Sequence, residues 1–378
     1  MSTNDRKETR PWGPHARRIV IQVADYLGFD GNELPGGRQR LIRDIARVIR
    51  DEWGKEVLIV QKGKEDFEKT DKDGFRVIAI GSDTRARGDL AFARKARQIL
   101  EDGDRLLYGS GEDAWPHFHQ PAKAIQHGVW WDGPFPWWKR VVQRHRAMEM
   151  VRRTDAVLCV DTNFINWLRC QGPEGLALCR KCTYLPNYAD TDKMGAISGE
   201  GHPANPIRIL YARRFEKKRG PELFLQSLVY LHQMGVKSRA TMLTIGGAET
   251  LKQLAAECGL QGSVKIVEED LNGVYRHYQD VDIAVVPTLW SEGTSLAAVE
   301  AIVAGVPVVA TPVGGLGNLV IPGFNGFLVT PSPQAIAEAI AALRNQERWA
   351  EMHRNCLSLR PSLSLANWSR NVLDWLRG

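Results

Sequence analysis

The 378-residue sequence lacks an apolar run that approaches the roughly 20 residues of a membrane-spanning helix. Its first stretch, MSTNDRKETRPWGPHARR, also lacks the apolar core that a secretory signal requires. The first absence excludes an integral membrane protein. The second predicts a cytoplasmic protein, in which residues 1–17 form a polar segment ahead of the first domain.

Cysteine is scarce and scattered along the chain. Of six cysteines, only Cys179 and Cys182 stand at CxxC spacing, in CRKC, and no second pair accompanies them. A single pair is weak support for zinc, which takes four ligands in structural sites. We therefore expect ordinary thiols and no bound metal, with a redox or metal role for this pair as the alternative.

Two motifs that would assign other functions are also missing. No G-x-G-x-x-G follows a predicted strand, which disfavours a nicotinamide-dependent dehydrogenase. The net charge of +6 favours anionic partners such as nucleic acid, phosphorylated ligands or anionic lipid. Because no recognisable nucleic-acid-binding module is present, we expect no nucleic acid partner.

What the sequence does contain is a regular alternation of short β-branched runs with longer helical ones, typical of parallel βαβ units. Its length suggests two domains with a cleft between them. We predict the α/β fold class, with two facing Rossmann-like domains. The predicted divisions are a first domain at 18–188, a linker at 189–206, a second domain at 207–360 and a final helical segment at 361–378.

The stretch EGTSLAAVEA places Glu292 in a loop after a predicted strand and Glu300 about two turns inside the following helix. This separation excludes an acid and base pair acting across one bond. The free N–H groups at the helix start suit a phosphate. With a diphosphate there, the two carboxylates could accept hydroxyl hydrogen bonds on either side, as a nucleotide-sugar requires. The alternative is that both acids only complement the helix dipole.

Followed by AGVPVVATPVGG and NGFLV, this stretch resembles the donor-binding motif of the family 4 glycosyltransferases, which have the GT-B fold. The resemblance is strong over 207–330 and loose over 18–187. It implies retaining transfer of a hexose from a nucleoside-diphosphate sugar to an acceptor hydroxyl, without a metal or other cofactor. It also implies a first domain that binds the acceptor and a final helix that crosses back to that domain.

The resemblance also implies roles for individual residues. In YARRFEKKRG, Arg214 matches the family's arginine, and Arg219 stands where a lysine is usual, with Lys218 as the alternative. The glycine loops are LPGGRQRL and TIGG, and the histidine is that of QHGVWWD. Catalysis is thereby assigned to His127, Arg214 and Glu292. Donor binding is assigned to Gly36, Gly37, Arg214, Lys218, Arg219, Gly246, Gly247, Glu292, Gly293, Thr294, Ser295, Leu296 and Glu300.

Three departures from the family pattern keep a second reading open. Arg219 replaces the usual lysine, Tyr188 a usual glycine and Asn318 a usual glutamate. The alternative function is therefore a non-catalytic subunit that binds a nucleotide-sugar or a glycan.

A tryptophan-rich and basic stretch, VWWDGPFPWWKRVVQRHR, suits either a saccharide acceptor or the headgroups of an anionic membrane. We interpret it as a contact with a saccharide or lipid-linked acceptor, at the inner face of the cell membrane. The setting would be assembly of bacterial surface polysaccharide or lipopolysaccharide. The alternative is aromatic packing beside a solvated basic face. The candidate residues are Trp130, Trp131, Trp137, Trp138, Lys139 and Arg140.

Overall fold

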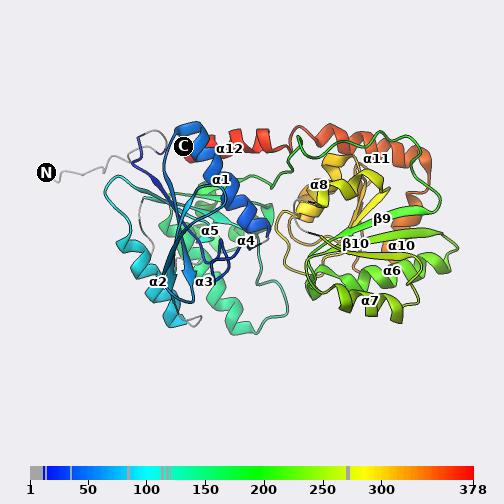
Figure 1. The fold of residues 1–378 in the computed structure, drawn as a ribbon, viewed down its shortest axis with the longest axis horizontal. Coiled ribbons are helices and arrows are strands. Elements are labelled where there is room, and N and C mark those ends of the chain that lie inside the picture. The colour runs from blue at the N-terminus through cyan, green and yellow to red at the C-terminus, as the bar shows by residue number, and fades with distance from the viewer. Residues whose placement is uncertain are drawn as a thin grey trace.

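The structure, a computed structural model, describes residues 12, 15–34, 36–82, 86–111, 115, 119, 121–269 and 273–378, with residues 86–88 described by their backbone alone. Two α/β domains lie next to each other (Figure 1). Over these described ranges, no helix is long and apolar enough to cross a membrane.

The first domain is built on an eight-stranded sheet in the order β3-β4-β2-β1-β5-β6-β7-β8. All neighbouring strands are parallel except β3, which runs antiparallel to β4 at the edge. The strands are β1 (Ile19–Gln22), β2 (Val57–Gly63), β3 (Phe67–Thr70), β4 (Arg76–Gly81), β5 (Arg105–Tyr108), β6 (Ala122–Gln126), β7 (Ala156–Cys159) and β8 (Cys182–Tyr184). The helices are α1 (Gly37–Trp53), α2 (Ala86–Gln98), α3 (Trp137–Arg153), α4 (Thr162–Arg169), α5 (Gly172–Leu178) and the 3₁₀ turn η2 (Cys179–Lys181).

The second domain has a six-stranded parallel sheet in the order β11-β10-β9-β12-β13-β14. Its strands are β9 (Ile207–Ala212), β10 (Ser238–Thr244), β11 (Val264–Glu268), β12 (Ile283–Val286), β13 (Val308–Ala310) and β14 (Gly326–Leu328). Its helices are α6 (Pro221–Gln233), α7 (Ala248–Glu257), α8 (Leu296–Ala304), α9 (Leu316–Leu319), α10 (Pro333–Ala342) and α11 (Gln346–Leu359), with 3₁₀ turns η3 (Lys217–Arg219) and η4 (Val274–Asp280). In both sheets the order reverses beside the first strand, and ligands of such folds bind beyond the carboxyl ends of the strands there.

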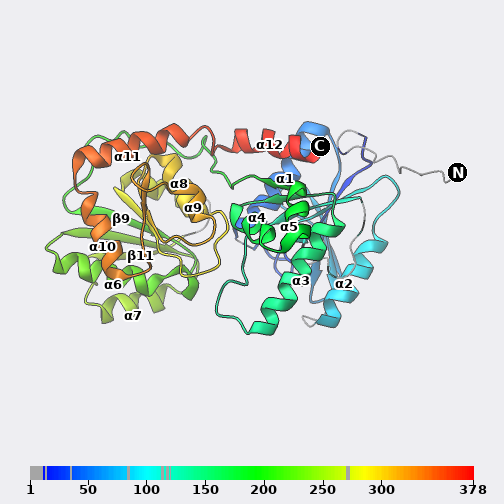
Figure 2. The same ribbon diagram turned by 180° about the vertical axis from the view of Figure 1, so that it is seen from behind.

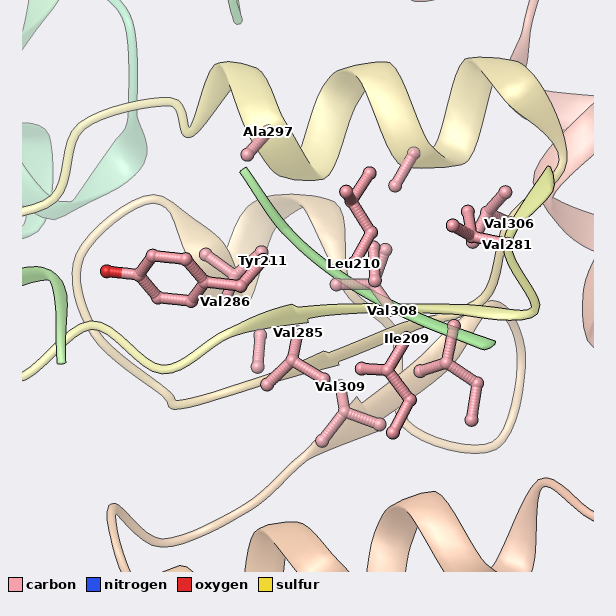
Figure 3. Close-up of a cluster of buried hydrophobic side chains, with 14 of the residues drawn as sticks. Ile209, Leu210, Tyr211, Val281, Val285, Val286, Ala297, Val306, Val308 and Val309 are labelled. Carbon is pink, nitrogen blue, oxygen red and sulfur yellow. The ribbon is translucent and has the colours of Figure 1, made fainter. Parts of the chain in front are cut away.

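The helix α8 lies over the middle of the second sheet and is buried along almost its whole length. Figure 3 shows the contact, with Ala297 of α8 above side chains from β9 and β12. A helix that is apolar on every side has to lie inside a core. This packing fixes the start of α8, and with it the loop that precedes α8.

The last helix, α12 (Leu365–Arg377), packs on the first domain beside α1, although the chain has just left the second domain (Figures 1 and 2). Its residues Trp368 and Trp375 belong to the buried core of the first domain. The buried Lys123 ammonium of β6 donates to the backbone oxygen of Trp375 at 2.6 Å. The predicted crossing of the final helix back to the first domain is therefore confirmed.

The two places where the chain passes between the domains lie side by side. The N–H of Ala189 donates to the oxygen of Leu363, and the N–H of Leu365 donates to the oxygen of Ala189, each at 2.9 Å. We call this hydrogen-bonded pair of crossings the hinge.

Candidate active site

The loop 287–295 joins β12 to α8 at the carboxyl edge of the second sheet. Ser291 in this loop has a φ of 59° and is the only residue other than glycine with positive φ in the described parts of the chain. The loop is held by the N–H of Leu289, which donates to the oxygen of Lys218 at 2.8 Å. Strained backbone of this kind is typical of ligand-binding loops, where the surrounding structure maintains it.

Glu292 is the charged centre of this loop. Its Oε2 accepts hydrogen bonds from Arg219 at 2.6 Å, from Thr288 Oγ1 at 2.7 Å and from Arg213. Burial raises the pKa of this carboxyl, but the charges of Arg213 and Arg219 outweigh burial and lower the pKa to about 2. Glu292 is therefore fixed as a carboxylate, and Oε1 is the oxygen without a hydrogen bond among the described residues.

Arg213 is a site residue that the sequence reasoning missed. Its guanidinium is buried and donates to Ser295 Oγ at 2.7 Å, to Thr288 Oγ1 at 3.3 Å and to Glu292. The neighbouring Arg214, which the sequence favoured, is half exposed and faces the first domain: a Cβ on Gly36 would lie 2.9 Å from its Nη2. The two successive arginines after a buried strand could have revealed Arg213. Successive side chains of an extended chain point to opposite sides, so Arg213 and Arg214 were bound to have different surroundings.

The starts of α1 and α8 approach each other across the gap between the domains. A Cβ on Gly37 of α1 would lie 3.0 Å from Leu296 Cδ1, the first residue of α8. The Ser295 side chain makes no capping hydrogen bond to α8. Helix N-termini present free N–H groups and positive potential, so two of them beside Arg214 create a place for a polyphosphate.

The two candidates for the lysine position share Glu216 as a partner, and Arg219 also reaches Glu292. Arg219 contacts Glu292, whereas the Lys218 ammonium lies 3.1 Å from Glu216 Oε2. Arg219 is thus the residue that contributes its charge to the Glu292 loop.

Glu300 is buried in α8 and meets a residue of the first domain. Its Oε1 accepts from Arg40 Nη1 of α1 at 3.2 Å, and its Oε2 accepts from the Tyr278 hydroxyl at 3.3 Å. Burial raises the pKa of Glu300, while Arg40 and Tyr278 act against that rise. Glu300 therefore has one hydrogen-bond partner in each domain.

His127 follows β6 and stands at the edge of the first domain. Its Nε2 lies 2.6 Å from the oxygen of Gly109, and because a carbonyl oxygen only accepts, Nε2 carries the proton. Burial, with a contribution from Arg38, lowers the pKa of His127 to about 4. The imidazole is therefore neutral at physiological pH, and Nδ1 can accept a hydrogen bond.

Residues 196–357 match the family model described as glycosyl transferases group 1. The second domain belongs to this family. Over 171 residues the chain is 32% identical to D-inositol 3-phosphate glycosyltransferase 2 of Catenulispora acidiphila, a match that covers 42% of this chain and 40% of that relative. The chain thus spans about 40% of the length of that curated relative.

In fold, the whole chain is similar to solved two-domain structures. Sucrose-phosphate synthase from Thermosynechococcus elongatus aligns with a TM-score of 0.77 at 18% identity, over 96% of this chain and 98% of that one. HepE of Anabaena, in complex with UDP-glucose, aligns with a TM-score of 0.72 at 16% identity, over 95% and 99%. This likeness shows the fold, and the predicted GT-B architecture of two facing Rossmann-like domains is confirmed.

The group 1 domain is held against the first domain by a set of polar contacts, which we call the seam. Thr294 Oγ1 donates to the oxygen of Val160, and the Asn187 amide donates to the oxygen of Thr294 at 3.2 Å. Asn318 accepts from the N–H of Thr162 at 3.0 Å and donates to its Oγ1 at 2.7 Å. The asparagine at 318 has a physical reason here, since an amide accepts and donates at once.

Tyr188, the second departure, also has a structural role beside the group 1 domain. Its hydroxyl donates to Asp44 Oδ2 at 2.5 Å, and its ring lies 4.1 Å from the ring of Trp368 of α12, centre to centre. The Arg40 guanidinium lies 5.5 Å from the centre of the tyrosine ring. Tyr188 therefore positions Arg40 at the hinge.

The glycines of TIGG lie next to the segment that follows β9 in the group 1 domain. Gly246 and Gly247 both have positive φ, and a Cβ on Gly247 would lie 2.3 Å from the ring of Phe215. Glycine is therefore required at 247 for the close approach of Phe215, the neighbour of Arg214.

The structure corrects one residue of the tryptophan-rich stretch. Trp131 is 2% exposed and packs edge-on against Phe164 and Trp167, so it is a core residue and cannot touch an acceptor or a membrane. By contrast, Trp137 and Trp138 at the start of α3 are 76% and 52% exposed. Trp130 is partly buried, and its ring lies 6.3 Å from that of Trp131 and 5.4 Å from that of Phe135, centre to centre. The sequence could not show which of these tryptophans is buried, because neighbouring residues of the same type carry no signal that distinguishes them.

No group of three or more histidine, cysteine or acidic side chains within the described ranges is arranged to hold a metal ion. Cys179 and Cys182 are partly buried free thiols, and Cys182 lies beside the buried Cys159.

Proposed function

We propose that the protein is a retaining glycosyltransferase that moves a hexose from a nucleoside-diphosphate sugar to an acceptor hydroxyl at the seam. The observation that carries the proposal is the convergence of the α1 and α8 N-termini with Arg214 and Arg219 beside a fixed Glu292 carboxylate. This arrangement suits a diphosphate next to a hydroxyl-rich group. The family of the second domain and the GT-B fold of the chain support the same reaction.

In the proposed reaction, the bond from the anomeric carbon to the diphosphate breaks, and a bond to the acceptor oxygen forms on the same face. The proton of the acceptor hydroxyl passes to the phosphate oxygen that leaves on that face. The leaving diphosphate gains negative charge, which Arg214, Arg219 and the N–H groups of α8 stabilise. Lys218, Gly36 and Gly37 would border the same anion.

The two glutamates then orient the donor on either side of the diphosphate. Glu292 accepts from sugar hydroxyls through Oε1, while Glu300 accepts from the ribose after Arg40 has moved away. Neutral His127 accepts from the sugar through Nδ1 and does not act as an acid. Gly246 and Gly247 give the nucleotide access below Arg214.

We further propose a saccharide or lipid-linked acceptor bound by the first domain, in assembly of bacterial surface polysaccharide or lipopolysaccharide. The exposed side chains of Trp137 and Trp138 support this proposal, because they offer apolar rings to an acceptor at a solvent-accessible surface. A peripheral position on the inner face of the cell membrane would bring such an acceptor to the seam.

A second candidate function is a non-catalytic subunit that binds a nucleotide-sugar or glycan. One observation favours it: the carboxylate expected to hold the ribose, Glu300, is already paired with Arg40. The two functions differ in turnover and share the donor site.

The test is thermal denaturation with UDP, GDP, ADP and dTDP and their glucose conjugates, on the wild type, Glu300→Ala and Arg214→Ala. Arg239→Ala is the matched control, because Arg239 is exposed at the start of β10, the edge of the sheet opposite the site. We expect one base to raise the Tm of wild type and control, and the site variants to lose that rise. A ligand at 100 times its Kd adds about 2.7 kcal/mol. Absence of a shift with every nucleotide would contradict the proposed transferase and leave, of the second candidate, only a subunit that binds a glycan. Nucleotide binding without release of free sugar or diphosphate would favour a subunit that binds a nucleotide-sugar.

A further inference from the structure

A buried acid that the proposed reaction does not yet use lies at the seam. Asp161 is the N-cap of α4, two residues after the end of β7, and it is almost wholly buried, with 1% of the residue exposed. One oxygen, Oδ1, caps the helix by accepting from the N–H of Phe164 at 3.2 Å. The other oxygen, Oδ2, has no hydrogen-bond partner in the part of the chain that the structure describes.

Capping alone does not explain an aspartate here. Serine, threonine and asparagine cap helices about as well with a single acceptor oxygen. A buried carboxylate oxygen without a partner costs stability, because the group has left water and gained nothing in exchange. The second oxygen therefore serves something that the protein alone does not contain.

Three glycines from separate loops meet around Asp161, and one of them, Gly128, lies against this oxygen. A Cβ on Gly128 would lie 2.6 Å from Asp161 Oδ2 and 3.0 Å from the Cα of Gly293. A Cβ on Gly293 would lie 2.5 Å from the oxygen of His127, and a Cβ on Gly315 would lie 2.9 Å from Asp161 Cβ. Any side chain at these positions would push the domains apart, so the backbones meet directly over the carboxylate.

The position of Asp161 relative to the donor site is also specific. The loop after β6 carries His127 and Gly128, the loop after β12 carries Glu292 and Gly293, and Asp161 lies beneath the place where these loops meet. Burial raises the pKa of Asp161 to about 6, and the negative charges of Asp132 and Glu292 add to the rise. Above that pH the group is an anion that requires a hydrogen-bond donor.

We propose that Asp161 Oδ2 accepts a hydrogen bond from a sugar hydroxyl that enters between Gly128 and Gly293 when the domains rotate apart at the hinge. The inference rests on the proposed function, to which it adds a hydroxyl-binding residue on the first domain. Two sources supply such a hydroxyl, the transferred sugar of the donor and the acceptor saccharide. The chemistry is the same for both, and the experiment separates them.

The experiment compares the wild type with Asp161→Asn and Asp161→Ser. Both substitutions keep a helix-capping oxygen, so a folded protein is expected, with circular dichroism as the check. Asp155→Asn is the matched control, since Asp155 is exposed at the opposite end of β7 and loses the same charge. Titration calorimetry uses the diphosphate that stabilises the wild type and the glucose conjugate of that diphosphate. Release of diphosphate is then measured with and without methyl glycosides of glucose, galactose and mannose.

We expect all four proteins to bind the free diphosphate within about twofold of one another. If the hydroxyl belongs to the donor, the Asp161 variants lose at least about tenfold in affinity for the glucose conjugate relative to the diphosphate. If it belongs to the acceptor, that ratio is unchanged, and glycoside-stimulated release falls by a similar factor. Variants that match Asp155→Asn in both measurements overturn the inference. A wild type that binds no diphosphate would instead overturn the proposed function.

Discussion

At the scale of single residues, two acids beside the seam have pKa values that their surroundings shift in opposite directions. Glu292, held by Arg213 and Arg219, has a pKa near 2, and Asp161, without a cation at its free oxygen, has a pKa of about 6. Ionisation of Glu292 therefore stabilises the folded protein, whereas ionisation of Asp161 destabilises it. Such residues are the usual compromise between stability and binding at a functional site.

The pKa of Asp161 gives a prediction for stability against pH. An aspartate in the unfolded chain has a pKa near 3.9, so from about pH 4 to 6 the folded state binds more protons than the unfolded state. The free energy of unfolding that Asp161 contributes is therefore complete below about pH 4 and is lost as the pH rises through 6. Asp161→Asn removes this loss, because asparagine does not ionise. We therefore expect the free energy of unfolding of Asp161→Asn minus that of wild type to be roughly 1–3 kcal/mol larger at pH 7.5 than at pH 4.5.

Urea denaturation of wild type and Asp161→Asn at the two pH values checks this expectation. If the difference in stability between Asp161→Asn and wild type were the same at both pH values, the pKa of Asp161 would be the same in the folded and unfolded states, and the prediction would be wrong.

The sequence pointed to the two glutamates and to Arg219, which pairs with Glu292, but not to Arg213 or Asp161. Glu292 and Glu300 could be found because their spacing lies within one βαβ unit. Arg213 and Asp161 could not, because their importance depends on contacts with loops far away in the sequence. Asn318 was noticed only as a departure, and its bond to Thr162 of the other domain explains it.

At the scale of elements, the alternation of strands and helices was readable because each core strand is a short run of buried apolar residues bounded by turns. β3 was not, since it is a four-residue edge strand whose letters FEKT are mostly exposed. An edge strand lacks the apolar signal that a central strand carries. The sequence showed that the stretch containing α3 is basic and rich in tryptophan. It did not show which residues of α3 are buried, because the basic residues leave no clear apolar face.

The start of α3 presents Trp137, Trp138, Val141 and Val142 to solvent, with 42% to 76% of each residue exposed. The Lys139 ammonium lies 5.5 Å from the centre of the Trp138 ring. Exposed tryptophan beside cations is typical of a headgroup contact. We expect the double substitution Trp137→Ser and Trp138→Ser to leave the Tm unchanged and to abolish sedimentation with phosphatidylglycerol vesicles at low salt.

The control for that measurement replaces two exposed apolar residues of the second domain, Tyr230→Ser and Met234→Ser, which should sediment like the wild type. A wild type that remains in the supernatant with anionic vesicles would contradict the membrane contact. Stacking on a soluble glycan would then be the better account of the tryptophans.

At the scale of the whole molecule, Arg40 connects the donor site to the hinge. It contacts Glu300 of the second domain, and its guanidinium also lies near the rings of Tyr188 and Tyr275. In the proposed function, a ribose that binds Glu300 would have to displace this arginine. The Arg40–Glu300 ion pair connects the two domains, so that displacement would also break a contact between them.

We expect Arg40→Gln to bind nucleotide more tightly than the wild type, by up to about tenfold, because Glu300 is then left buried without its cation until the ribose arrives. Arg47→Gln is the control, since Arg47 lies on the same helix and pairs with Asp44 and Asp73. Calorimetric titration with the preferred diphosphate is the measurement. Weaker binding by Arg40→Gln than by Arg47→Gln would mean that Arg40 holds the nucleotide instead of competing with it.

The return of α12 to the first domain has a consequence for how the protein is made. A ribosome releases β1–β8 well before α12, so the face of α1 that α12 covers, and the ammonium of Lys123, wait for residues synthesised after the entire second domain. The domain that is begun first is thus completed last. A product of premature termination inside α11 would contain a finished sheet order and an uncovered core, the kind of chain that chaperones retain and proteases remove.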